Sequence, residues 1–201
     1  MSMKRLLGLG LFLILLVGCT PSHNQKVTEN SIPVKDATQE HISHPHINGS
    51  NWTKLLSMSL PSTIQDFHLI NTQIHSKNIF LFFTYRLSNK PFEGIAYVNQ
   101  SGSMSTLENI DTAQVDQSSP YTLHQMSGSL SSEPKRNYIV TAGLINDKKI
   151  QQVQIIYPNN TAAIKVVGST THSYMDSQIG LNSIREIDYL GSDLKVLFRR
   201  K

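Results

Sequence analysis

Residues 79–86 read Ile-Phe-Leu-Phe-Phe-Thr-Tyr-Arg, a stretch rich in aromatic side chains and without a residue suited to cap a helix. Aromatic and β-branched residues favour strands, and both alternating faces of this stretch are apolar at its start. We therefore expect a central strand of a sheet. A second strand is expected over residues 93–98, because the polar cluster Ser88-Asn89-Lys90-Pro91 is typical of a turn between strands.

The C-terminal third shows the alternation of apolar and polar residues that is typical of half-buried strands. The apolar residues that alternate are Tyr138, Val140, Ala142 and Leu144, then Val153, Ile155 and Tyr157, then Ala162, Ile164 and Val166, and finally Leu194, Val196 and Phe198. Residues 146–149, 158–161 and 191–193 separate these segments and are rich in Asn, Asp and Gly, which tolerate positive φ. We expect hairpin connections there, and an all-β fold, either an antiparallel sandwich or a partly open barrel.

Helices are expected to contribute little after residue 50. No segment there has a sustained apolar period of 3.6 residues, although residues 54–60 or 111–117 allow a short helical turn. The Ser-rich segment 118–136 is either a long connection within one domain or a boundary between two small β units, and we favour one domain. A domain of about 150 residues buries roughly two-thirds of its unfolded surface, so it needs no disulfide.

The N-terminus has the pattern of a secretory signal peptide. Lys4 and Arg5 precede an uncharged, mostly apolar run over residues 6–18. A membrane-spanning helix needs about 20 apolar residues, so this run is too short to span a bilayer and has the length of a signal-peptide core.

The run ends in Leu16-Val17-Gly18-Cys19, which resembles the lipobox of bacterial lipoproteins. The resemblance implies that Cys19 receives a diacylglyceryl group and that cleavage before it removes residues 1–18. Cys19 is the one cysteine in the chain. Two acyl chains anchor a protein firmly, so we expect attachment to the cell membrane, with the mature protein on its extracytoplasmic face.

Residues 19–50 are expected to be the lipidated cysteine and a flexible tether, followed by the β domain over residues 51–201. The segment from residue 20 to 50 contains no aromatic residue, and Pro21, Pro33 and Pro45 interrupt any helical period. Such a segment buries too little apolar area to offset its ordering entropy. A flexible chain of this length reaches roughly 30 Å.

The C-terminal part also resembles, loosely, small uncharacterised envelope lipoproteins of Bacillus-like bacteria. The shared feature is the order of three segments, Val140 to Ile145, Val153 to Tyr157 and Ile184 to Tyr189. The resemblance covers about a third of the chain and includes no chemical motif. It implies the extracytoplasmic compartment and the β class, and it implies no activity.

The strongest candidate for metal binding is the group His41, His44 and His46. Neutral imidazole is the commonest metal ligand, and three of them within six residues could chelate zinc, copper or nickel. The alternative interpretation is that they are solvated polar residues of the tether, because a flexible site loses ordering entropy on binding. Capture of metal ions by these residues is the alternative function.

Motifs of other chemistry are missing from the sequence. It contains no Gly-x-Ser-x-Gly elbow, no phosphate-binding glycine loop and no Asp-x-Asp-x-Asp calcium loop. The formal net charge of +4 includes Lys4 and Arg5. Without them it is about +2, too small to indicate a nucleic-acid partner. We expect no enzymatic activity and no cofactor, and interpret the protein as a binding or structural module that contacts an envelope protein or wall component through a sheet edge or hairpin loops.

Overall fold

The computed structural model describes residues 45–49, 51–167 and 172–201, which belong to one compact unit. This part of the chain is all-β apart from one short helix, and its strands pair antiparallel. The elements are β1 (His46–Asn48), α1 (Trp52–Ser57), β2 (Gln65–His75), β3 (Asn78–Leu87), β4 (Lys90–Ser101), β5 (Met104–Gln114), β6 (His124–Leu130), β7 (Glu133–Leu144), β8 (Gln152–Ile156), β9 (Ala162–Val166), β10 (Ser173–Ile179), β11 (Glu186–Leu190) and β12 (Val196–Arg200).

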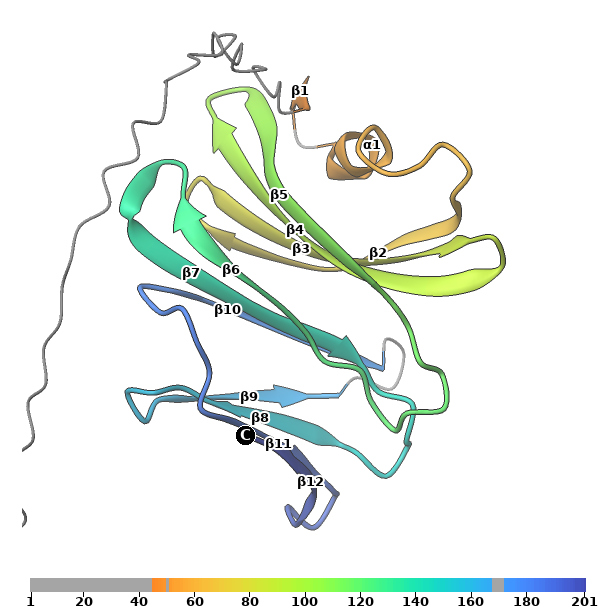
Figure 1. Cartoon of the computed structure of the whole chain (residues 1–201). Helices are drawn as coiled ribbons and strands as arrows, with labels where there is room; N and C mark the ends of the chain where they lie inside the picture. The colour runs from red at the N-terminus through yellow and green to blue at the C-terminus, as the bar shows by residue number, and fades with distance from the viewer. Residues whose placement is uncertain (1–44, 50, 168–171) are drawn as a thin grey trace, which may run out of the picture. The chain divides into compact units, whose positions relative to one another are not determined.

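The strands form three sheets, which Figure 1 shows stacked as layers. The N-terminal sheet has the order β1-β5-β4-β3-β2, the middle sheet β10-β7-β6, and the C-terminal sheet β12-β11-β8-β9. The predicted all-β class is confirmed, and the architecture has one layer more than a two-sheet sandwich.

The N-terminal sheet is apolar on both faces, as residues 79–86 predict. Leu81 and Phe83 of β3 pack on its outer face with Leu55 and Leu56 of α1, which cover that face. The helix begins after Asn51, whose side chain accepts a hydrogen bond from the Lys54 amide at 3.1 Å. A helical turn was expected near residues 54–60 or 111–117. The structure forms it near the first, whereas residues up to 114 in the second belong to β5.

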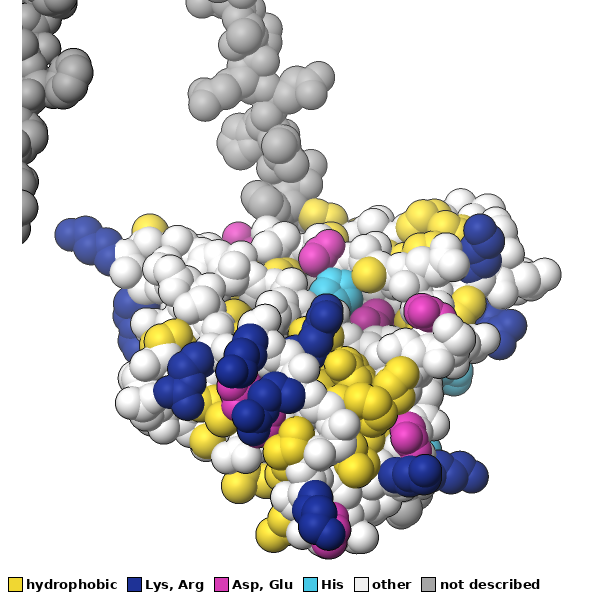
Figure 2. Space-filling model, turned by 60° about the horizontal axis from the view of Figure 1, so that its bottom comes forward, with side chains coloured by type: hydrophobic (Ala, Val, Ile, Leu, Met, Phe, Trp, Pro, Cys, Tyr) yellow, Lys and Arg dark blue, Asp and Glu magenta, His cyan; other side chains and the backbone are white. Residues whose placement is uncertain are grey.

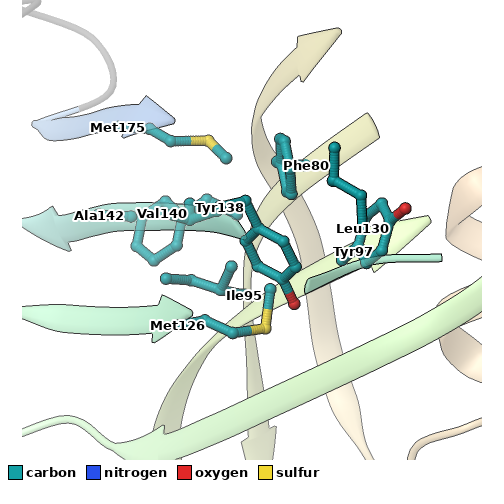
Figure 3. Close-up of a cluster of buried hydrophobic side chains, with 10 residues drawn as sticks. Phe80, Ile95, Tyr97, Met126, Leu130, Tyr138, Val140, Ala142 and Met175 are labelled. Atoms are coloured by element: carbon teal, nitrogen blue, oxygen red, sulfur yellow. The ribbon is translucent and has the colours of Figure 1, made fainter. Parts of the chain in front are cut away.

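A core of aromatic and aliphatic residues joins the N-terminal sheet to the middle sheet (Figure 3). The ring of Tyr138, from β7, lies 5.1 Å from the ring of Phe80 and 5.0 Å from that of Tyr97, measured between centroids. Other members of this core are Phe82, Ile95, Met126, Leu130, Val140, Ala142 and Met175. Aromatic pairs at this distance add to the stability that comes from burying their area.

A second core joins the middle sheet to the C-terminal sheet. Ile139 and Tyr174 of the middle sheet pack with Val153, Ile155 and Tyr189 of the C-terminal sheet. Strand β7 is therefore buried on both faces, with Tyr138 in the first core and Ile139 in the second. The alternation in the sequence predicts one buried face for this strand. The third layer covers the other.

Two of the expected connections have a different structure. Residues 118–136, expected to be a connection or a domain boundary, contain β6, which forms a hairpin with β7. The strand is formed because His124, Met126 and Leu130 are buried, while the serines beside them point elsewhere. Residues 146–149 do not close a hairpin, because they lead from β7 in the middle sheet to β8 in the C-terminal sheet. The expected turns at 158–161 and 191–193 do join paired strands.

The edge strands of the C-terminal sheet expose apolar side chains. Ile164 and Val166 of β9 alternate as expected but are 60% and 72% exposed, because their shared face points to solvent. Leu194 lies outside β12, in the turn before it, with a φ of 61°. Figure 2 shows this side of the molecule, where apolar side chains adjoin basic and acidic ones. Alternation shows which side chains share a face of a strand, but it does not show which of the two faces is covered.

Strand β1 lies within the segment expected to be tether. It pairs with β5 and is fixed at both ends by backbone hydrogen bonds, from the Leu107 amide to the Pro45 carbonyl at 2.9 Å and from the Gly49 amide to the Ser103 carbonyl at 2.6 Å. The Ser105 hydroxyl also donates to the Gly49 carbonyl at 2.6 Å. The structured part therefore includes residues before Asn51.

A chain that begins at residue 51 is expected to melt several degrees below one that begins at residue 42. The shorter chain loses the hydrogen bonds of β1, each worth about 1 kcal/mol, and leaves the buried Ser105 hydroxyl without its partner. About 1 kcal/mol corresponds to roughly 2–4 °C in a domain of this size. Thermal unfolding of the two chains checks this, and equal midpoints would show that β1 adds no stability.

Candidate functional site

The residues singled out from the sequence are not brought together in the described part of the chain. Cys19, His41 and His44 lie outside the described residues. His46 lies in β1 with an exposed side chain. Among the described residues, no group of three or more His, Cys, Asp or Glu side chains could hold a metal ion. The metal-binding hypothesis therefore depends on residues outside the described part.

A polar cleft of about 380 Å³ lies where the N-terminal and C-terminal sheets meet the loop that leads into the middle sheet. Strands β4 and β5, the loop at residues 115–123 and strand β12 form its walls, and we call it the junction cleft. The side chains that matter for its chemistry are Glu93, Asp116, Tyr121, Thr122, Phe198 and Arg200. Loops that a rigid scaffold positions often carry binding residues.

Glu93 and Thr122 form the floor of the cleft. Glu93 comes from β4 and is 3% exposed. The Thr122 hydroxyl donates to Glu93 Oε2 at 2.6 Å and accepts from the Leu144 amide at 2.7 Å, so it joins the loop to β4 and β7. Burial raises the pKa of Glu93 above its ordinary value, while the Thr122 hydrogen bond and the neighbouring His124 act in the opposite direction.

His124 lies behind Glu93, between two carboxyl groups. Its Nε2 is 3.2 Å from Asp111 Oδ2, and its Nδ1 is 3.8 Å from Glu93 Oε1. The side chain is 5% exposed, and Nδ1 has no hydrogen-bond partner among the described residues. The imidazole thus connects β6 to β4 and β5, across the interface between the N-terminal and middle sheets.

The rim of the cleft carries charges of both signs. The exposed carboxylate of Asp116 accepts hydrogen bonds from the Ser118 amide at 2.9 Å and the Ser118 hydroxyl at 2.6 Å. These bonds hold the pKa of Asp116 below its usual value, so the group is ionised at neutral pH. Arg200 extends from β12, and within the described part of the chain it makes no ion pair.

Aromatic side chains form the wall between the rim and the C-terminal sheet. Tyr121 stacks on the buried ring of Tyr189 at a centroid distance of 3.7 Å. The ring of Phe198 lies 5.6 Å from that of Tyr121, at a tilted angle. The Tyr174 hydroxyl donates to the Thr122 carbonyl at 2.9 Å, which fixes the loop to the middle sheet. Burial raises the pKa of Tyr174 and keeps its hydroxyl protonated. The cleft is thus built on ordered elements.

Glu93 and Asp116 have pKa values shifted in opposite directions, as the acid and the base of a hydrolase have. Their contacts argue against that role. Glu93 is buried and hydrogen-bonded to Thr122, so it does not present a proton to the open cleft. The Thr122 hydroxyl is occupied by Glu93 and the Leu144 amide. The arrangement is suited to binding a ligand at the rim above a rigid floor.

A second polar cluster joins the middle and C-terminal sheets. Asp176 Oδ1 is 2.6 Å from Lys165 Nζ, and its Oδ2 accepts from Tyr157 at 2.5 Å and Gln178 at 2.9 Å. Burial and Asp176 raise the pKa of Tyr157, so the phenol remains a donor. This cluster is enclosed and satisfied, which indicates a structural role.

Asp176 in β10 and Asp188 in β11 each find a partner inside the domain. Both are buried, and Asp188 accepts two hydrogen bonds from Arg199, at 2.6 and 2.7 Å. A buried carboxylate persists in a protein when it is paired in this way. Asp193, by contrast, is exposed in the turn between β11 and β12.

Sequence reasoning missed the junction cleft, because its residues come from segments that are far apart. Glu93 falls in the strand expected over residues 93–98, and Arg200 lies near the other end of the chain. One local signal was present. Glu93 directly precedes the apolar run Gly94 to Val98, and a charged residue in a buried strand calls for a partner. The partner, Thr122, could not be found from spacing.

No family model, curated protein or solved structure matches the chain. The one helix of the described residues is too short to cross a membrane, and no membrane-spanning helix is found among them.

We expect the variant Glu93→Gln to have a higher free energy of unfolding than the wild type at neutral pH. A raised pKa means that the folded chain holds this proton more tightly than the unfolded chain, so wild-type stability falls as pH rises above the ordinary value of 4.5. Gln cannot ionise, and its amide can still accept from Thr122. The gain is expected to be about 1 kcal/mol and to vanish below pH 4.5. Urea unfolding at both pH values measures it, and a gain independent of pH would contradict the explanation.

Proposed function

We propose that this protein is a binding module of the bacterial cell envelope, anchored by lipid on Cys19 and without catalytic activity. The observation that supports binding most directly is the rim of the junction cleft. Arg200 makes no ion pair there with the described residues, Asp116 is exposed, and the rings of Tyr121 and Phe198 line the wall. Pockets with aromatic walls and a few polar groups are typical ligand sites.

The anchor is proposed from the sequence. Lys4 and Arg5, the apolar run after them and Leu16-Val17-Gly18-Cys19 agree with a lipoprotein signal peptide. A cleaved and lipidated chain would hold the β domain outside the cytoplasm, on the segment that follows Cys19. The ligands within reach are then wall polymers and envelope proteins.

The contacts that occupy the buried polar groups support binding without catalysis. Beneath the rim, Glu93 contacts both Thr122 and His124, and the Thr122 hydroxyl also accepts from a backbone amide. A catalytic acid or nucleophile has to reach the reacting atom within hydrogen-bonding distance. The exposed groups of the cleft, by contrast, are suited to contact a ligand without rearrangement of the fold.

Co-sedimentation tests this function. Full-length protein, purified in detergent micelles, is mixed with an envelope fraction that contains wall polymer and envelope proteins, and the bound fraction is measured against concentration. We expect saturable binding and no release of soluble wall fragments. Asp116→Asn and Arg200→Gln each remove a charge at the rim and are expected to weaken binding about tenfold, or about 1.4 kcal/mol.

The matched control is Lys148→Gln, which removes an exposed charge from a loop that does not line the cleft. It is expected to bind as the wild type does. Absence of saturable binding would contradict the proposed function, and release of wall fragments would show that the protein is catalytic.

A further inference from the structure

We infer that the ligand of the junction cleft is an uncharged saccharide that carries hydroxyl and acetamido groups, such as the glycan strand of an envelope polymer. The inference rests on the proposed function and adds the chemical class of the ligand. Three features of the cleft carry it: charges of both signs at the rim, an amide side chain in the same cleft, and aromatic rings on one wall.

The charges at the rim favour a ligand that both donates and accepts hydrogen bonds. Arg200 and the ionised Asp116 line the same cleft, so neither a simple anion nor a simple cation finds charges of a single opposite sign there. Hydroxyl groups of a saccharide can donate to the carboxylate and accept from the guanidinium, so one such ligand can satisfy both groups.

The Asp116 carboxylate is held in place at the exposed rim. Its Oδ1 atom accepts both hydrogen bonds from Ser118, which fixes the carboxylate in the loop. The Asp116 side chain is exposed, so its carboxylate can also accept from a ligand. Gln114, at the end of β5, lines the same cleft and offers an amide that pairs with an acetamido group in both directions.

The aromatic wall favours a ligand with an apolar face. Tyr121 is stacked on Tyr189, and Phe198 lies at a tilted angle to Tyr121, so both rings are held by packing. Ordered rings offer contact area at little entropic cost. Pyranose rings present C–H groups on one face and hydroxyls at their edge, which matches a wall of rings beneath a polar rim.

A zwitterionic peptide also carries groups that could contact both charges. The structure favours the saccharide over it, because Asp116 and Arg200 are exposed and ion pairs at exposed sites contribute little. Hydrogen bonds to hydroxyls combined with ring contacts do not depend on burying an ion pair. The peptide is therefore the competing outcome of the test.

Isothermal titration of full-length protein in detergent micelles separates the two. The probes are a tetramer of N-acetylglucosamine and an alanine tetrapeptide with free ends. We expect the saccharide to bind at one site and the peptide to bind at least tenfold more weakly. Arg200→Gln, Asp116→Asn and Phe198→Leu should each weaken the saccharide about tenfold, and Lys148→Gln should not.

Failure of this inference can be told from failure of the proposed function. In one outcome, the saccharide fails to bind while envelope binding still depends on Arg200. That result would show that the inferred ligand class is wrong, and the proposed binding function would stand. Tighter binding of the peptide would do the same. Absence of envelope binding by the wild-type protein would contradict both the inferred ligand and the proposed function. A variant is compared only after its circular dichroism spectrum and melting midpoint match the wild type.

Discussion

Ile155→Asp is expected to leave the domain unfolded at room temperature. Ile155 lies in β8, is fully buried, and packs in the core between the middle and C-terminal sheets. Aspartate there would place a carboxylate among apolar side chains, where no donor replaces its water. The cost is expected to reach most of the ~5–15 kcal/mol that stabilises a domain of this kind. Far-ultraviolet circular dichroism and urea unfolding measure it.

The matched control for Ile155→Asp is on the opposite face of the same strand. Gln154→Asp is one candidate, but Gln154 pairs with Asp188, and a second acid beside it adds repulsion. Gln152→Asp is cleaner, because Gln152 pairs with Leu190 and Val166 and is partly exposed. Its cost is expected to stay below about 1 kcal/mol. Equal losses in the two variants would mean that β8 is tightly packed on both faces.

Gly143→Ala is expected to destabilise the domain by about 3 kcal/mol, the upper range for overpacking a core. A Cβ atom at Gly143 would lie 2.1 Å from the Thr122 carbonyl oxygen and 2.8 Å from the ring of Tyr174. The first of these contacts is with backbone, so the loop at residues 115–123 would have to move. That shift would also break the hydrogen bond from Tyr174 to Thr122. Ligand affinity at the cleft is therefore expected to fall together with the melting midpoint.

Gly191→Ala serves as the control for Gly143→Ala. Its Cβ would lie 3.2 Å from the end of the exposed Asp193 side chain, which can rotate away. We expect a loss below about 1 kcal/mol and unchanged binding. If both glycine variants lower the free energy of unfolding equally, the close packing of the loop on β7 would not be what fixes the cleft.

The strand class was predictable where the side-chain pattern reflects burial directly. Residues 79–86 are apolar on both faces, and the structure buries both faces of β3. The alternation in β9 predicted which residues share a face, but it could not tell that this face is solvent. Lys165, on the other face, reaches Asp176 inside the domain. Such a contact depends on the third layer, which no local pattern reveals.

The strand β6 could have been found from the sequence. His124 and Met126 alternate with Gln125 and Ser127, which is a strand pattern, but the serine content of the segment obscured it. The junction cleft could not have been found. Glu93, Thr122 and Arg200 belong to three sheets or their connecting loops, and only the stacking of the layers places them at one cleft.

Lipid labelling of Cys19 decides whether the protein is a binding module anchored at the cell envelope. Cells that express the wild type or Cys19→Ala are grown with an alkyne fatty acid, and the protein is isolated and analysed for label and for its N-terminal residue. Cys19 is the only thiol in the chain, so we predict label on the wild type, a mature N-terminus at Cys19, and an unlabelled, uncleaved variant. Equal label on both proteins, or none on the wild type, would contradict the lipid anchor and with it the proposed place of the protein in the cell.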